Sequence, residues 1–303
     1  MAAVSALASA IARRAWREYA DLRRRAASAG SARPALDRIG DVARSDVGAW
    51  LAATEGAHDR YRAACAMADG SVAVVTVTNR PDRIGDVVEN VARQRRAPDE
   101  LVVVVNGDRA DPTAPVDAAP VDRALDALRR AGTPVTLLER PADVSLGACL
   151  NAAMAVTSAR FVAKFDDDDR YGPSYLADAL RAHGYAGAGV VGKHTFFAHL
   201  VERDETILRF PGHEFTYTST LAGATLVLDR ERLGDLGFRD LSVGEDRALL
   251  GDCNRRGIST FSADRFGFAY RRASDHSWAV PLDAFVEGSI PIGAGLPLDR
   301  IDR

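Results

Sequence analysis

Four short apolar runs separated by helical segments constrain the fold of this 303-residue chain more than any other feature. Each run is rich in β-branched residues, and between the runs apolar residues recur at helical spacing. Strands that are apolar along their whole length are typical of parallel sheets covered by helices on both faces. The predicted strands are residues 71–78, 101–106, 134–140 and 159–165. This βαβαβαβ order predicts an α/β protein, a three-layer α/β/α sandwich with a Rossmann-like, mostly parallel sheet.

Composition excludes several other classes of protein. Hydrophobic residues make up 47% of the chain, and a formal net charge of −3 provides no basic field to hold nucleic acid. The longest charge-free stretch of interest, residues 215–228, is too short for a membrane-spanning helix of ~20 residues. The three cysteines lie far apart and form no CxxC pair, which predicts reduced thiols and a cytoplasmic protein.

The first 70 residues differ in pattern from the rest and predict a helical N-terminal extension. Apolar residues follow helical spacing from Ala6 to Gly30, where arginines outnumber acidic residues, and a second helical stretch runs to Ala68. Two interpretations stay open: packing on the main domain or a second subunit, and contact with an anionic membrane surface at its inner face. The expected organisation is an extension over 1–70, a main domain over 71–280 and a C-terminal tail over 281–303.

Four consecutive aspartates, Asp166 to Asp169, follow the last predicted strand. Ligands of such sheets bind beyond the carboxyl ends of the strands, where Thr78-Asn79-Arg80 and Asn106-Gly107-Asp108 are also expected. Adjacent carboxylates repel one another unless a positive group lies between them. A solvated acidic loop is the alternative, but the position between a buried strand and a helix favours a divalent cation site with oxygen ligands.

Five segments in this order resemble a family 2 glycosyltransferase. They are VVTVTNRP, LVVVVNGD, SLGACLNAAMAVTSARFVAKFDDDDRYGPSYL, AGATLVLDRERLGDLGF and VGEDRALLGDCNRRG. The resemblance covers about Ser71 to Val280 and implies the GT-A fold. It also implies an inverting enzyme that uses a nucleotide-diphosphate sugar and a divalent cation, Mn²⁺ or Mg²⁺.

The resemblance also implies where the metal binds. Asp166 and Asp168 match the DxD motif of the family. We expect Asp168 to ligate the metal directly, and Asp166 and Asp167 to lie near the ribose or a metal-bound water. His276 is expected as a further metal ligand, because a late histidine completes the metal site in several GT-A enzymes. For nearby Trp278, stacking on the acceptor sugar and filling the core both stay open.

Four further residues match positions near the nucleotide. Thr78 and Arg80 match the loop that holds the nucleotide in the family. Asn106 stands where the family usually has an aspartate that reads a base edge, so the base is not implied. Asn151 matches a position close to the nucleotide, and a polar residue turned to solvent is the alternative.

Two acidic residues, Glu245 and Asp246, begin a predicted helix, where the helix dipole keeps a carboxylate ionised. In the family the aspartate of this pair deprotonates the acceptor hydroxyl, so the resemblance makes Asp246 the general base. Glu245 would then orient the acceptor or Asp246. Lys193-His194 and Ala222-Gly223-Ala224 match regions that border the acceptor pocket.

The sequence therefore predicts a cytoplasmic, metal-dependent glycosyltransferase that extends a glycan or a lipid-linked acceptor in cell-surface polysaccharide synthesis. Peripheral membrane contact or a homo-oligomer through the N-terminal helices is part of this expectation. A nucleotidyltransferase is one alternative, although it leaves the Glu245-Asp246 helix unexplained. A non-catalytic sugar-nucleotide-binding scaffold subunit is the other, and the intact Asp168 and Asp246 argue against it.

Overall fold

The computed structural model describes residues 55–56, 58–59, 62–107, 118–273 and 280–303. The helix expected from Ala6 to Gly30 lies outside these residues, and so do His276 and Trp278.

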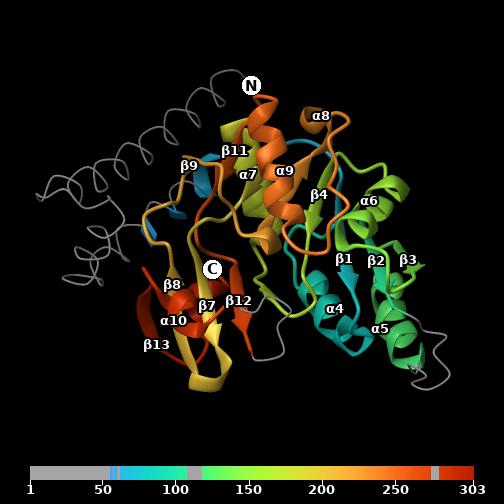
Figure 1. Cartoon of the computed structure of the whole chain (residues 1–303), viewed down its shortest axis with the longest axis horizontal. Helices are drawn as coiled ribbons and strands as arrows, with labels where there is room; N and C mark the ends of the chain where they lie inside the picture. Colours follow the sequence, from blue (N-terminus) through green and yellow to red (C-terminus); the bar gives the residue numbers. More distant parts are fainter. Residues whose placement is uncertain (1–54, 57, 60–61, 108–117, 274–279) are drawn as a thin grey trace, which may run out of the picture.

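An eight-stranded sheet forms the centre of the molecule, in the order β3-β2-β1-β4-β10-β6-β11-β9 (Figure 1). The four predicted strands are confirmed as parallel neighbours: β1 (Val72–Thr78), β2 (Glu100–Asn106), β3 (Val135–Arg140) and β4 (Phe161–Lys164). The other members are β6 (Val190–Gly192), β9 (Thr216–Tyr217), β10 (Val227–Asp229) and β11 (Thr260–Ser262). Strands β9 and β10 run antiparallel to their neighbours, so the sheet is mostly parallel.

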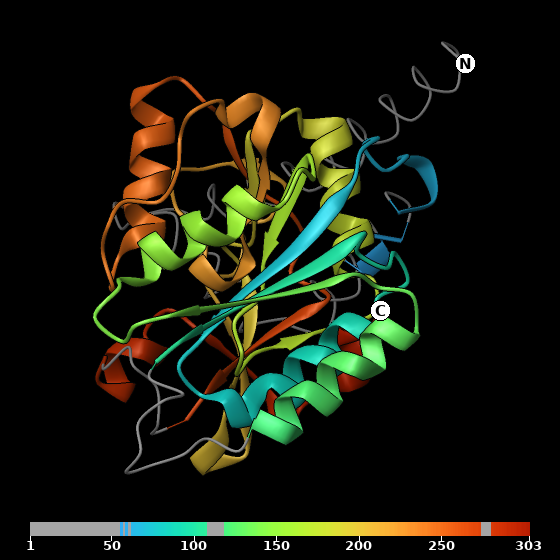
Figure 2. The ribbon, with the colours of Figure 1, turned by 90° about the vertical axis from the view of Figure 1, so that its right-hand side faces the viewer.

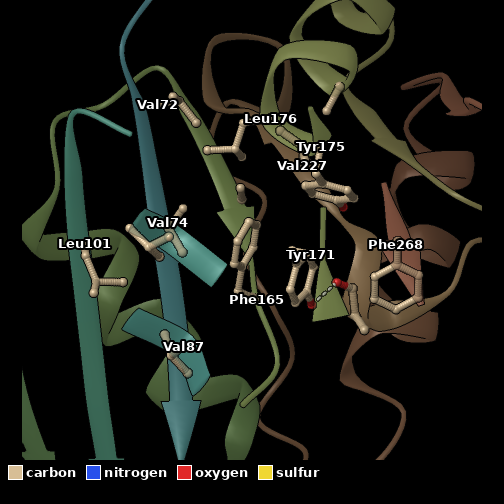
Figure 3. Packing of buried hydrophobic residues seen from close by; sticks show 14 of the residues in the cluster. Val72, Val74, Val87, Leu101, Phe165, Tyr171, Tyr175, Leu176, Val227 and Phe268 are labelled. Atoms are coloured by element: carbon tan, nitrogen blue, oxygen red, sulfur yellow. Dashed lines mark hydrogen bonds between the residues drawn. The ribbon is translucent and has the colours of Figure 1, made fainter. Parts of the chain in front are cut away.

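Helices cover both faces of this sheet and produce the expected three layers (Figure 2). Side chains alternate across a strand, so Val74 faces one layer and Val75 the other. The first face is covered by α4 (Ile84–Ala92), α5 (Ala118–Arg130) and α7 (Tyr175–Ala186). The second is covered by α6 (Leu146–Val156), α8 (Arg230–Leu233) and α9 (Glu245–Arg255). Figure 3 shows the first cluster, in which the ring of Phe165 faces that of Tyr171.

A second sheet, of five strands, lies beside the first in the order β13-β8-β7-β12-β5. Its strands are β5 (Arg170–Tyr171), β7 (Phe196–Leu200), β8 (Glu205–Arg209), β12 (Phe268–Arg272) and β13 (Ile290–Ala294). The aspartates connect β4 of the first sheet directly to β5 of the second. The loop that carries the predicted metal ligands is therefore fixed at both ends.

The structure differs from the expected C-terminal tail at 281–303. This segment forms α10 (Leu282–Val286), β13 and α11 (Leu298–Ile301), and β13 pairs antiparallel with β8. Phe285, Ile290 and Ile301 are all buried. The segment is part of the domain because its apolar side chains complete the core.

The described end of the N-terminal segment packs on the main domain. His58 is fully buried, Arg62 forms a two-pronged ion pair with Asp178 of α7, and the amide of Ala68 donates to the carbonyl of Leu180 at 3.0 Å. For these residues the packing interpretation holds. No helix in the described ranges has the length and apolarity needed to cross a membrane.

Candidate active site

The aspartate loop takes its shape from Tyr171, the last residue of β5. The amide of Asp166 donates to the Tyr171 hydroxyl at 2.8 Å, and this hydroxyl donates to the carbonyl of Ala224 at 2.6 Å. The Tyr171 ring stacks on Phe165, with centroids 3.7 Å apart. One buried tyrosine thus joins the start of the aspartate loop to the Ala222-Gly223-Ala224 segment.

Arg80 and Thr78, at the carboxyl end of β1, hold the middle of the aspartate loop. The Arg80 guanidinium donates to Asp168 at 2.7 Å and also to both carboxylate oxygens of Asp167. The Thr78 hydroxyl donates to Asp167 and accepts from the Arg80 amide at 2.8 Å. Burial raises the pKa of Asp167, and Arg80 and Thr78 partly offset this rise. The structure thus brings four sequence-predicted residues into direct contact.

Asp169 turns away from solvent toward β12. Its carboxylate accepts from the amide of Arg271 at 2.9 Å, and only 4% of the residue is exposed. Burial raises the pKa of Asp169 well above its usual range, and the charges of Asp168 and Asp166 raise it further. This residue therefore links the aspartate loop to the second sheet.

Two buried amide side chains of the α4 region, which were not predicted from the sequence, support the same loop. Asn90 donates to the carbonyl of Asp169 at 2.8 Å and accepts from the amide of Tyr171 at 3.0 Å. Gln94 donates to the carbonyl of Gly172 at 2.9 Å. Asn90 lies on the face of α4 that carries the buried Ile84 and Val91, and Gln94 follows the end of the helix. A polar residue on an apolar helical stripe was the signal that could have identified Asn90.

Lys164 places a buried positive charge beside the carboxylates. It is 5% exposed, and its Nζ donates to Asp166 Oδ1 at 2.5 Å. Burial lowers the pKa of Lys164, but Asp166 and then Glu245 and Asp246 more than compensate, so the pKa lies above its usual value. This lysine was also missed, although a lone cation in the apolar run FVAKF could have drawn attention to it.

Glu245 and Asp246 begin α9 directly after Gly244, whose φ of 82° only glycine adopts readily. Glu245 is buried, and burial raises its pKa; Lys164 opposes this rise, while Asp246 and Asp166 add to it. The Asp246 carboxylate lies against Gly223, where an added Cβ would be 2.1 Å from Oδ2. The acidic pair is therefore assembled with the aspartate loop around Lys164.

The two asparagines expected near the nucleotide make backbone contacts. The Asn106 amide donates to the carbonyls of Pro141 at 2.7 Å and Val144 at 3.1 Å, so it holds the loop after β3. Asn151 donates to the carbonyl of Phe238 at 2.8 Å and accepts from its amide at 2.9 Å. The Asn151 side chain thus holds another loop and is not turned to solvent.

Lys193, which was expected to border the acceptor pocket, forms its side-chain hydrogen bonds with Asp264. Its Nζ donates to the carbonyl of Asp264 at 2.8 Å and to the carboxylate at 3.2 Å. Burial raises the pKa of Asp264, but the charges of Lys193 and His58 outweigh this effect and lower the pKa to about 2. His194, the next residue, stacks on His213 with ring centroids 4.3 Å apart.

The sequence profile of glycosyl transferase family 2 matches residues 72–221, from the start of β1 past the aspartate loop. The chain belongs to glycosyltransferase family 2. The match ends before Gly223, so the roles of Glu245 and Asp246 depend on the geometry above. No curated protein sequence matches the chain.

Solved glycosyltransferases share the fold of this family 2 member. The mannosyltransferase PcManGT from Pyrobaculum calidifontis, in complex with GDP-Man and Mn²⁺, is 18% identical with a TM-score of 0.51, over 80% of this chain and 70% of that one. Residues 1–349 of S. aureus TarS, in complex with UDP-GlcNAc, are 17% identical with a TM-score of 0.52, over 72% of this chain and 64% of that one. The likeness shows the GT-A fold, and this chain spans less than two thirds of the TarS structure.

In the described part of the glycosyltransferase, two carboxylates could supply oxygen ligands to a divalent cation. Asp166 and Asp168 supply carboxylate oxygens, the donors that Mg²⁺ and Mn²⁺ prefer. Lys164 and Arg80 contact these two carboxylates. Among the residues described, no three His, Cys, Asp or Glu side chains are grouped so that they could hold a metal ion. The carboxylates fit a cation whose other ligands come from the substrate or from outside the described residues.

Proposed function

We propose that the protein is a metal-dependent, inverting glycosyltransferase. It moves a sugar from a nucleotide-diphosphate sugar to a hydroxyl of a glycan or lipid-linked acceptor, in cytoplasmic synthesis of a cell-surface polysaccharide. The nucleotide-sugar complexes of the two structural neighbours support a donor of this class. The Mn²⁺ bound with GDP-Man in PcManGT supports a divalent cation.

The donor half of the site is the loop from Asp166 to Asp168 with Thr78 and Arg80. Breaking the sugar–diphosphate bond leaves negative charge on the β-phosphate, and a bound divalent cation neutralises such charge. We assign Asp168 and Asp166 as its carboxylate ligands, with Arg80 holding Asp168 in place at 2.7 Å. His276, outside the described residues, remains part of this proposal as a third protein ligand.

The acceptor half is the start of α9. Asp246 takes the proton from the acceptor hydroxyl as the new glycosidic bond forms, and the departing diphosphate takes the electron pair of the broken bond. Gly223 leaves the space that the Asp246 carboxylate occupies. Glu245 is buried beside Asp246 and orients it.

One observation supports this proposal most: buried side chains connect the donor half of the site to the acceptor half. Lys164 donates a hydrogen bond to Asp166, and the nearby charges of Glu245 and Asp246 raise the pKa of this lysine. Tyr171 joins the Asp166 amide to Ala224, next to Gly223. The acidic loop and the candidate base come from distant parts of the chain, and their shared partners support a single site for transfer between two substrates.

The test is metal-dependent binding and turnover of the donor. The purified chain is titrated by calorimetry with GDP-Man and with UDP-GlcNAc, with Mn²⁺ and after treatment with EDTA. Because the carboxylates repel a diphosphate, binding should require the cation. Slow hydrolysis of the bound donor should release a nucleoside diphosphate.

The products separate the alternatives. Release of pyrophosphate would indicate a nucleotidyltransferase. Tight donor binding with no turnover in the presence of any acceptor extract would indicate a scaffold subunit. Equal donor binding with Mn²⁺ and with EDTA would contradict the metal site.

A further inference from the structure

Arg209, the last residue of β8, is a buried cation without a counter-ion in the described part of the chain. It is 5% exposed, and its Nε and Nη1 are buried with no hydrogen-bond partner. These two atoms carry three N–H donors. Arg265, another buried arginine, does have a counter-ion: its Nη1 lies 3.4 Å from the carboxylate of Glu214.

Aromatic rings and a second arginine surround the Arg209 guanidinium. Its Cζ lies 3.9 Å from the ring centroid of Phe285 and 4.4 Å from that of Phe210. Arg272 lies over the same Phe285 ring at 5.2 Å, and Tyr270 stacks on it at 5.6 Å. Both guanidinium groups therefore lie near the Phe285 ring.

The strand register places these side chains on one face of the second sheet. Arg209 pairs with Phe196 of β7, Tyr270 with Ala198, and Arg272 with Leu200. Residues two apart on a strand share a face, so Arg209, Tyr270 and Arg272 all point to the side that α10 covers. The arrangement comes from regular strand geometry and not from a loop.

A buried cation without a partner is costly, and a neighbouring like charge adds to the cost. Burial lowers the pKa of Arg209 to about 10, and the charge of Arg272 contributes to this lowering. The rings offset only part of the cost, since a cation over an aromatic face gains ~0.5–2 kcal/mol. An anion that accepts hydrogen bonds from the three N–H groups of Arg209 would offset the remaining cost of burying this charge.

We propose that Arg209, with Arg272 and Tyr270, binds a phosphate group carried by the acceptor. Phosphate supplies the acceptor oxygens and the negative charge that the Nε and Nη1 groups of Arg209 lack among the described residues. Arg272, which also donates to the carbonyl of Val280, adds a second positive charge nearby. This assignment rests on the proposed function, which defines the acceptor.

The position of the arginine pair separates this phosphate from that of the donor. The donor diphosphate belongs with Asp168 and Arg80, at the carboxyl ends of β1 and β4. The arginine pair lies on β8 and β12, and β12 borders the aspartate loop through the bond from the Arg271 amide to Asp169. Burial raises the pKa of Tyr270, and the nearby charges of Asp169 and Asp168 raise it further. A phosphate here would lie next to the site of transfer but apart from the donor.

The experiment uses inorganic phosphate as the probe and UDP or GDP with Mn²⁺ as the comparison. Calorimetry in phosphate-free buffer compares the wild type with Arg209→Met, which keeps the apolar stem, and Arg209→Lys, which keeps the charge. The control is Arg129→Met on α5, which removes an arginine paired with the exposed Asp126. Thermal unfolding with and without phosphate provides a second readout.

We expect the wild type and Arg129→Met to bind phosphate equally, and Arg209→Met to bind it at least about tenfold more weakly. Arg209→Lys should lie between them. Without phosphate, Arg209→Met should melt no lower than the wild type, because it removes an uncompensated buried charge. Phosphate should raise the melting temperature of the wild type and of Arg129→Met by the same amount, and should not raise that of Arg209→Met. Nucleotide affinity should be the same in all four proteins.

Equal phosphate binding by the wild type and Arg209→Met would overturn the inference. A parallel loss of phosphate and nucleotide binding in Arg209→Met would also overturn it, since Arg209 would then serve the donor. Failure of the wild type to bind either nucleotide would contradict the proposed function instead. The comparison of phosphate binding would be unaffected by that failure.

Discussion

At the scale of single residues, Gly223 determines where the proposed base can lie. We predict that Gly223→Ala lowers turnover by about 10–10²-fold, because the new Cβ would displace the Asp246 carboxylate that now lies 2.1 Å from its position. Donor affinity should stay within about twofold, since the donor contacts lie on another loop. Transfer kinetics and donor calorimetry measure the two effects.

The matched control is Gly251→Ala, on the same helix as Asp246. A Cβ at Gly251 meets only Arg255 Nη1 at 3.5 Å, an ordinary contact. This variant should keep its turnover and gain up to about 1 kcal/mol of stability from the better helix former. Equal turnover of the two variants would show that the position of Asp246 does not limit the reaction.

Sequence reasoning at this scale identified acidic residues better than their partners. The aspartates were visible because four carboxylates after a buried strand need compensation. Lys164 and Asn90 were not identified, because their roles depend on contacts with Asp166 and Tyr171 that only the folded chain creates. The double contact of Asn151 with Phe238 is a long-range pairing of the same kind.

At the scale of elements, α11 shows that the C-terminal segment stabilises the second sheet. Ile301 is fully buried, whereas Leu298 on the same helix is 44% exposed. We predict that Ile301→Ala lowers the free energy of unfolding by about 2–5 kcal/mol, because it opens a cavity in the core. Leu298→Ala should change it by less than about 0.5 kcal/mol. Denaturant titration of both variants measures the difference, and equal values would mean that residues 281–303 do behave as a tail.

The parallel strands β1 to β4 of the first sheet could be predicted from the sequence, and most of the second sheet could not. Continuous apolar runs identified β1 to β4. The strands of the second sheet are two to five residues long and mix polar with apolar residues. Strand β5 pairs with β12, and β13 pairs with β8, so each edge strand pairs with a strand far away in the sequence, about which local pattern carries little information.

At the scale of the whole molecule, the segment before β1 and the C-terminus meet on α7. Arg62 pairs with the buried carboxylate of Asp178 and donates to the carbonyl of Arg303 at 2.9 Å. We predict that Arg62→Met lowers the free energy of unfolding by about 1–3 kcal/mol, since Asp178 keeps Arg181 but loses its two-pronged partner.

Arg129→Met is again the control, because its partner Asp126 is exposed and such pairs contribute about 0–0.5 kcal/mol. Chemical unfolding at neutral pH measures both variants. If Arg62→Met is no less stable than Arg129→Met, residues 55–68 are attached to the domain by other contacts.

The central claim, that one site combines a metal-binding loop with a separate base, is tested most directly by comparing Asp168→Asn with Asp246→Asn. Donor affinity with Mn²⁺ and the single-turnover rate of transfer are measured for each. Asp168→Asn removes a charged ligand of a hard cation, so donor binding and rate should both collapse. Asp246→Asn should bind donor like the wild type but transfer about 10²–10⁴-fold more slowly, because it cannot accept the proton. Loss of donor binding in Asp246→Asn to the same degree as in Asp168→Asn, or a full rate of transfer, would contradict the account.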